Sequence, residues 1–127
     1  MTPALMTRLG AGLMFLAVGL GAFGAHALKG KLDADMLAVF ETGVKYQVYH
    51  ALALLLLASL RGPSKAAWCF TAGIVFFSGS LYLLALTGVR KWGAVTPIGG
   101  LLFLAGWLIV LFSRAPSADS ILNRLNL

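Results

Sequence analysis

Four long apolar runs, each free of charged residues, make up most of this 127-residue chain. The runs cover residues 9–28, 46–60, 66–89 and 92–113. An α-helix needs roughly 20 apolar residues to cross about 30 Å of bilayer hydrocarbon. The second run is shorter than this, so its helix has to borrow residues from 42–45, with Lys45 extending toward the headgroups. The pattern predicts an all-α, integral membrane four-helix bundle with spans over about 9–28, 43–60, 66–88 and 94–113.

Between the first two spans the pattern becomes amphipathic. Gly30 is a suitable helix end, and Asp33 is a suitable N-cap for the next helix. Helical spacing then separates an apolar face from a polar face: the apolar residues are Met36, Leu37, Phe40 and Val44, and the polar residues are Asp35, Glu41, Thr42 and Lys45. This favours a short amphipathic interfacial helix over about 33–43, with a bend at Gly43. One long helix that projects from the bilayer is the alternative.

Small residues recur every four positions in the first span, at Ala17, Gly21 and Ala25. Such a stripe lets a second helix approach closely, so we expect it to be a packing face. At the other end of the chain, the segment after Arg114 is short and polar. It is predicted to be either a surface helix or disordered.

The amino-acid composition indicates that this protein lies in a membrane. Hydrophobic residues make up 60% of the chain and charged residues 11%, whereas soluble domains are nearer half apolar and a quarter charged. The surroundings are therefore mostly lipid, and residues 1–127 form one membrane domain. The net charge of +6 comes from scattered basic residues, which is typical of contact with anionic lipids and not of nucleic-acid binding. The single cysteine, Cys69, excludes an intramolecular disulfide.

Candidate chemistry is concentrated in residues 19–50, which hold both histidines and three of the four acidic residues. A polar pocket near one membrane surface is predicted from His26, Glu41, Tyr46, Gln47 and His50. A carboxylate beside a histidine can relay protons or hold a cation. The alternative is a hydrogen-bonded plug that fixes helix packing. The spacing matches no zinc signature and no nucleophile elbow, so we expect no catalytic residue, no metal and no cofactor.

Four blocks occur in order along the chain: GAFGAHAL at 21–28, FETGVKYQVYHALALL at 40–55, SGSLYLLALTG at 78–88 and TPIGGLLFLAGW at 96–107. Together they resemble the YgdD/YwdK-type family of small bacterial inner-membrane proteins, a domain of unknown function with small eukaryotic transmembrane relatives. The resemblance covers nearly the whole chain. It implies four membrane helices and a membrane location, and it brings no known activity.

These observations favour a protein that is not an enzyme and has a binding or structural role. The expected partners are membrane lipids, a small hydrophobic molecule, a second copy of the chain or another membrane protein, and no nucleic acid is expected. The alternative function is a small proton-coupled transporter or carrier that uses His26, Glu41 and His50. Small multidrug exporters place an acidic residue inside the first span, and this chain has none there. That difference weakens the transporter hypothesis.

An even number of spans places both termini on the same side of the membrane, predicted to be the bacterial inner membrane. Basic residues on the terminal side are Arg8, Arg61, Lys65, Arg114 and Arg124, and those on the opposite side are Lys29, Lys31, Lys45, Arg90 and Lys91. Equal counts do not orient the chain by the positive-inside rule. Entry of Lys45 into a membrane helix and the positive amine ahead of the first helix both favour cytoplasmic termini.

Overall fold

The computed structural model describes residues 1–114 and 118–126, and these contain helices and no strand. The elements are α1 (Pro3–Phe23), η1 (Gly24–Leu28), α2 (Ala34–Leu60), α3 (Ser64–Gly73), η2 (Ile74–Ser78), α4 (Gly79–Thr87), η3 (Arg90–Ala94), α5 (Thr96–Leu111) and α6 (Ala118–Arg124). Four continuous helical stretches are long and apolar enough to cross a membrane: Pro3–Leu28, Ala34–Leu60, Ser64–Thr87 and Arg90–Leu111. The predicted all-α bundle of four spans is confirmed.

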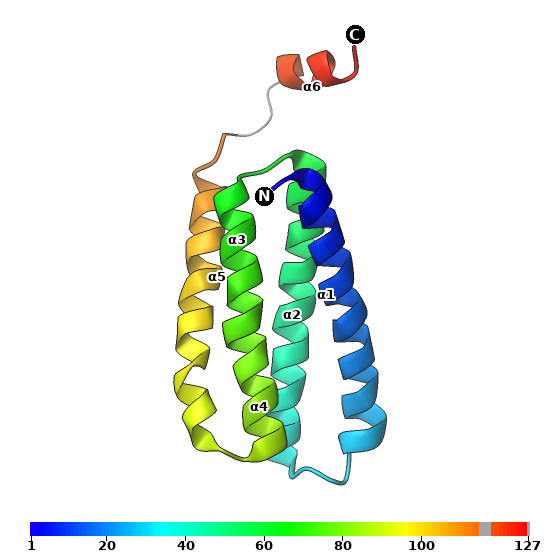
Figure 1. The fold of residues 1–127 in the computed structure, drawn as a ribbon, viewed down its shortest axis with the longest axis vertical. Coiled ribbons are helices and arrows are strands. Elements are labelled where there is room, and N and C mark those ends of the chain that lie inside the picture. Colours follow the sequence, from blue (N-terminus) through cyan, green and yellow to red (C-terminus); the bar gives the residue numbers. More distant parts are fainter. Residues whose placement is uncertain (115–117, 127) are drawn as a thin grey trace.

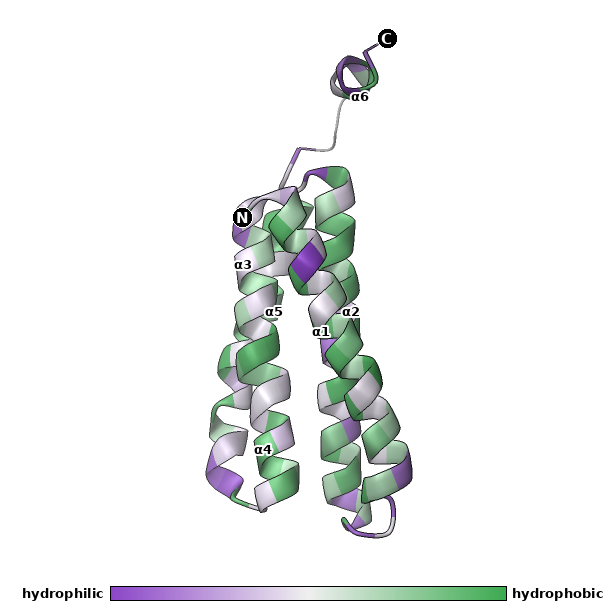
Figure 2. Ribbon diagram, turned by 45° about the vertical axis from the view of Figure 1, so that its right-hand side comes forward, coloured by the Kyte–Doolittle hydropathy of each residue, from purple (hydrophilic) through white to green (hydrophobic). Residues whose placement is uncertain are grey.

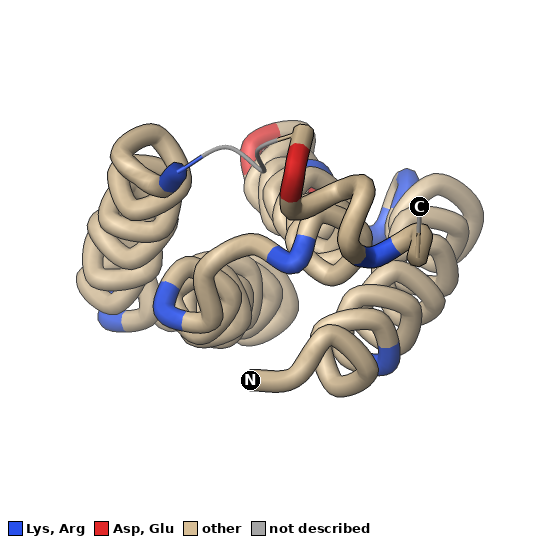
Figure 3. The backbone as a smooth tube through the Cα atoms, turned by 90° about the horizontal axis from the view of Figure 1, so that it is seen from above, with Lys and Arg blue, Asp and Glu red and all other residues tan. Residues whose placement is uncertain are grey.

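The four spans form an open row in which each stretch runs antiparallel to its neighbour (Figure 1). Seen along the helix axes, α2 and the α3–α4 stretch lie in the middle, and α1 and α5 lie at the two outer ends (Figure 3). Burial agrees with this order: 8 of 27 and 9 of 24 residues are buried in the two middle spans, against 5 of 26 and 3 of 22 in the outer spans. α1 therefore packs mainly against α2, which leaves much of its surface to lipid.

The separate interfacial helix expected over 33–43 is wrong, because Ala34–Leu60 is one uninterrupted helix. The expected bend at Gly43 is absent. A Cβ on Gly43 would lie 2.8 Å from a ring carbon of Tyr82, so this glycine lets α2 and α4 approach closely instead of turning the chain. The long helix that the sequence left open as the alternative is the one that forms.

Local signals at the helix ends act as expected. The Asp33 carboxylate accepts a hydrogen bond of 2.8 Å from the Met36 backbone N–H, which caps α2. Gly30 has a φ of +86° and ends the first span. We name the end of the bundle that holds residues 29–33 and η3 the loop end, and the opposite end, with Met1 and the turn at 61–63, the terminal end.

The packing stripe of α1 differs from the predicted one. Ala17 is buried and Gly21 is half-buried, but Ala25 is exposed. Gly10 and Gly24 complete the stripe, because a Cβ on Gly24 would lie 3.0 Å from the Phe40 ring and a Cβ on Gly10 would lie 2.9 Å from Leu55 Cγ. An α-helix has 3.6 residues per turn, so a strict four-residue repeat drifts around the axis and leaves the interface.

The bundle core lies mostly toward the terminal end and around the middle of the spans. Its fully buried side chains include Met6, Leu54 and Phe70, and a smaller cluster nearer the loop end is formed by Leu28, Phe40 and Ala85. Colouring by hydropathy shows apolar residues along the helices and hydrophilic residues gathered mainly near the two ends (Figure 2).

In η2 the helix widens into a π-turn, and Gly99 of α5 packs directly on its backbone. Residues 118–124 form the short surface helix that was one of the two expectations for the tail, and 115–117 and 127 lie outside the described residues.

Candidate functional site

The structure divides the five predicted pocket residues into two groups. Gln47 and His50 are buried, at 3% and 4% exposure, as the cost of turning polar groups toward lipid predicts. Tyr46, at 38% exposure, belongs with the exposed residues His26 and Glu41, although its ring packs against Phe77. The prediction that all five line one inward-facing pocket is wrong for His26 and Glu41. Glu41 and His50 are nine residues apart, and each residue of an α-helix turns by 100°, so the two side chains lie on opposite sides of α2.

The His50 ring makes two hydrogen bonds, one as a donor and one as an acceptor. Its Nδ1 donates to the Tyr46 carbonyl oxygen at 2.7 Å, and its Nε2 accepts from the Trp107 indole N–H at 3.0 Å. A carbonyl oxygen only accepts and an indole N–H only donates, so this arrangement suits a neutral imidazole with its proton on Nδ1. The ring also stacks on Phe103, with the ring centres 3.6 Å apart. A second proton on His50 would oppose the indole N–H, so this histidine is poorly arranged as a proton carrier.

Gln47 joins three helices through one amide. Its Nε2 donates to the Leu13 carbonyl oxygen of α1 at 2.8 Å, and its Oε1 accepts from the Tyr82 hydroxyl of α4 at 2.7 Å. Ser78 in η2 donates to the Gly43 carbonyl oxygen of α2 at 2.7 Å. In the described part of the chain every buried side-chain nitrogen and oxygen has a hydrogen-bond partner. The buried polar residues therefore form a closed plug that ties the helices together, which is the packing alternative.

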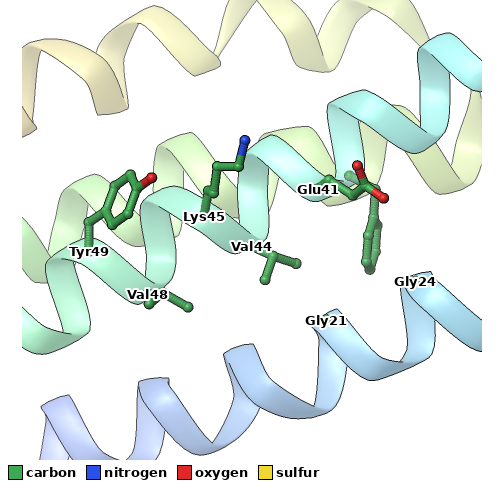
Figure 4. Close-up of a pocket in the computed structure, with 8 residues that line it drawn as sticks. Gly21, Gly24, Glu41, Val44, Lys45, Val48 and Tyr49 are labelled. Carbon is green, nitrogen blue, oxygen red and sulfur yellow. The ribbon is translucent and has the colours of Figure 1, made fainter.

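The exposed residue Glu41 lies at a different feature, a groove of about 300 Å³ between α1 and α2 (Figure 4). Gly21 of α1 and Gly24 of η1 form one wall. The other wall comes from α2 and consists of Phe40, Glu41, Val44, Lys45, Val48 and Tyr49. Val44 and Val48 point toward α1, whereas Lys45 and Tyr49 extend from α2 on the side away from α1 and Glu41 lies at the end of the groove near Gly24 (Figure 4). The missing side chains of the two glycines open the groove, because a Cβ at either position would contact α2.

The charges in this groove have no partner within the described residues. The Glu41 and Lys45 side chains are exposed, and neither side chain makes a hydrogen bond or ion pair with residues 1–114 or 118–126. They are four residues apart, so they occupy the same side of α2 one turn from each other. No group of three or more histidine, cysteine, aspartate or glutamate side chains suited to a metal occurs in the described residues. The groove thus offers apolar walls with one anion and one cation.

Sequence reasoning missed the two aromatic partners of the plug, Tyr82 and Trp107. Trp107 lies well inside a span, away from the interfacial belts in which tryptophan is enriched. A buried indole N–H or phenol hydroxyl usually finds a hydrogen-bond partner. Such residues in the middle of a span were therefore the available signal, but their partners lie 35 and 57 positions away in the sequence.

Comparison with known proteins supports the membrane assignment. A family model described as "Protein of unknown function (DUF423)" matches residues 20–100. The UPF0382 membrane protein SH2409 of Staphylococcus haemolyticus is 51% identical over 110 residues, covering 83% of this chain and 90% of that protein. The UPF0382 membrane protein YwdK of Bacillus subtilis is 47% identical over 110 residues, covering 81% of this chain and 89% of that protein. No solved structure matches.

Proposed function

Because this chain belongs to the DUF423 family, a family of membrane proteins whose description assigns no activity, we propose its role from its own geometry. It is a binding protein and not an enzyme. It holds an amphiphilic molecule from the bilayer in the groove between α1 and α2. The buried polar plug has a structural role in this proposal. A transporter role finds no support in the comparisons with known proteins.

The observation that carries the proposal is the charged, open groove beside a closed core. The polar atoms of Gln47 and His50 are already bonded within the protein, so they have little capacity left for a ligand. Glu41 and Lys45 keep their full bonding capacity and border a space of about 300 Å³. Pockets that bind small molecules combine mostly apolar walls with a few polar groups that orient the ligand. The groove has this composition, and it opens to the bilayer, where amphiphiles are abundant.

Filling the groove tests the proposal. A membrane containing a photoreactive fatty-acyl lipid should label residues of the groove on illumination, and mass spectrometry of the peptides locates the adducts. Gly21→Leu fills the groove and should remove most of that labelling. Gly12→Leu is the matched control, because a Cβ there meets nothing within 4 Å. Equal labelling of the groove in both variants would contradict the proposal.

We also propose that the protein lies in the bacterial inner membrane with cytoplasmic termini. Lys45 lies about 16 Å along α2 from the first residue of that helix. It therefore does not count as a loop-end charge, and four basic residues remain at the loop end. The terminal end keeps all five of its own, so the positive-inside rule then favours it as the cytoplasmic end. Green fluorescent protein fused to the C-terminus should fluoresce, and alkaline phosphatase fused there should be inactive. The reverse pair of results would invert the assignment.

A further inference from the structure

We propose that the ligand of the groove is a zwitterionic phospholipid with a primary ammonium headgroup, such as phosphatidylethanolamine. Glu41 binds the ammonium and Lys45 binds the phosphate. This inference rests on the proposed function, because it names the class of amphiphile that the groove between α1 and α2 takes. Its argument has three steps: the depth of the two charges, their order along the membrane normal and the poor fit of a second copy of the chain.

The depth of the two charges calls for a partner from outside the chain. The uncharged run 9–28 of the first span is about 30 Å long, which matches the hydrocarbon thickness and places the boundary at the loop end near Leu28. Gly21 and Gly24, which face Val44 and Phe40, lie about 10 Å and 6 Å inside that boundary. Lys45 follows Val44 and Glu41 follows Phe40, so Lys45 lies about 10 Å and Glu41 about 6 Å inside the boundary, where charged side chains are costly without a partner. A lipid headgroup drawn into the groove supplies both partners.

The order of the charges matches the covalent order of the headgroup. Glu41 is closer to the loop end than Lys45, by about 6 Å along the helix. In an ethanolamine phospholipid the ammonium is outermost, the phosphate comes next and the acyl chains are deepest. The carboxylate therefore meets the ammonium and the lysine meets the phosphate, and both contacts are charge-assisted hydrogen bonds. Beyond Lys45 the groove continues along Val48 and Tyr49, which offer apolar surface to an acyl chain.

A second copy of the chain fits the groove less well. Two copies in one membrane are related by an axis along the membrane normal, so equivalent residues lie at the same depth. Glu41 would then lie level with Glu41 of the second copy, and Lys45 with the other Lys45. Like charges at the same level repel. An ethanolamine lipid brings opposite charges to both levels.

Native mass spectrometry of the full-length protein in detergent tests the inference by titration with three lipids of equal acyl chains. Phosphatidylethanolamine has both headgroup charges, phosphatidylglycerol has the phosphate without the ammonium, and diacylglycerol has neither. We expect phosphatidylethanolamine to bind about tenfold more tightly than phosphatidylglycerol. Glu41→Gln should remove that preference, and Lys45→Gln should weaken binding of both phospholipids. The double variant Glu41→Lys with Lys45→Glu, which exchanges the two charges, should lose the preference and also bind both phospholipids more weakly. Asp35→Asn and Lys31→Gln are the controls, because these exposed charges lie outside the groove.

The outcomes separate this inference from the proposed function. Equal binding of the three lipids, unchanged by Glu41→Gln and Lys45→Gln but lost in Gly21→Leu, would overturn the headgroup assignment and leave the groove as the binding site. No binding of any lipid would overturn both. A dimer that dissociates on Glu41→Gln or Lys45→Gln would also overturn both, because the groove would then be an interface between two copies.

Discussion

At the scale of single residues, burial separates the two kinds of polar chemistry in this protein. His50 is enclosed by α2, Phe103 and Trp107, and both of its ring nitrogens have partners. Glu41 belongs to the same helix but is exposed and borders the groove. The first arrangement stabilises the bundle, and the second leaves charge free to bind a ligand. Proximity in sequence suggested one shared site, and the helical rotation between the two residues excludes it.

Trp107→Phe tests the role of the indole hydrogen bond. The change keeps an aromatic ring at this partly exposed position but leaves His50 Nε2 without its donor. Hydrogen bonds between membrane helices contribute about 0.6 kcal/mol on average and up to about 1.7 kcal/mol. We expect a loss of about 1 kcal/mol in unfolding free energy, measured by denaturant titration in detergent. Trp68→Phe, at a side chain that is 54% exposed, is the control, and an equal loss in both variants would contradict the role of the bond.

Two neighbouring glycines of α5 give a second test at this scale. A Cβ on Gly99 would lie 2.3 Å from the backbone nitrogen of Phe77, whereas one on Gly100 would come no closer than 3.9 Å to that residue. Backbone moves less readily than a side chain, so Gly99→Ala should cost about 1–3 kcal/mol. Gly100→Ala should leave the thermal midpoint unchanged or raise it, because alanine favours the helix. Equal midpoints for the two variants would show that α5 does not pack closely on η2.

At the scale of elements, α2 organises the bundle. Its 27 residues contact α1 through Gln47, η2 through Gly43 and α5 through His50. These contacts recur at intervals of three and four residues, which is the spacing of one helical face. α2 therefore has one face that bonds to other helices and another, with Glu41 and Lys45, that is open to lipid.

A double-mutant cycle on Gln47 and Tyr82 measures how strongly α2 and α4 are coupled. Gln47→Leu and Tyr82→Phe each remove one side of a hydrogen bond, and the double variant removes both. We expect the double variant to lose less unfolding free energy than the sum of the single variants, by about 0.5–1.5 kcal/mol. The control cycle pairs Gln47→Leu with Thr87→Val, whose hydroxyl bonds within its own turn. Additive losses in both cycles would mean that the hydrogen bond contributes nothing to stability.

At the scale of the whole molecule, the open row makes the four spans unequal. α1 has one main neighbour, α2, and only 5 of the 26 residues of its span are buried. Regions with few buried contacts open at a lower free energy than the global unfolding of a protein. α1 is thus expected to be the most easily separated span, and the groove that it forms with α2 is expected to widen or close without disturbing α3–α5.

Gly10→Leu tests this inequality, because a Cβ on Gly10 already approaches Leu55 Cγ at 2.9 Å and the Ala51 carbonyl oxygen at 3.0 Å. Hydrogen–deuterium exchange in detergent should become faster in peptides of α1 and stay unchanged in peptides of α3 and α5. Gly12→Leu, with nothing within 4 Å, should leave the exchange of all peptides as it is. Faster exchange throughout the bundle would show instead that the four spans unfold as one unit.

The membrane location, the four spans and the helix ends at Gly30 and Asp33 were all readable from the sequence. Hydropathy over some twenty residues and capping within one turn are local properties of the chain, so no knowledge of the neighbouring helices is needed. The burial of Gln47 and His50 also followed from the cost of exposing polar groups to lipid.

The continuity of α2, the partners of the plug and the position of Glu41 emerged only from the packed helices. An amphipathic stretch such as 33–43 fits equally well at a membrane surface and in a longer helix, and contact with Tyr82 at Gly43 selects the second. His50 meets Trp107 across 57 positions of sequence, a pairing that no local pattern encodes. The groove exists because Gly21 and Gly24 face Val44 and Phe40, next to Lys45 and Glu41 on α2, and that alignment depends on how two helices rotate against each other.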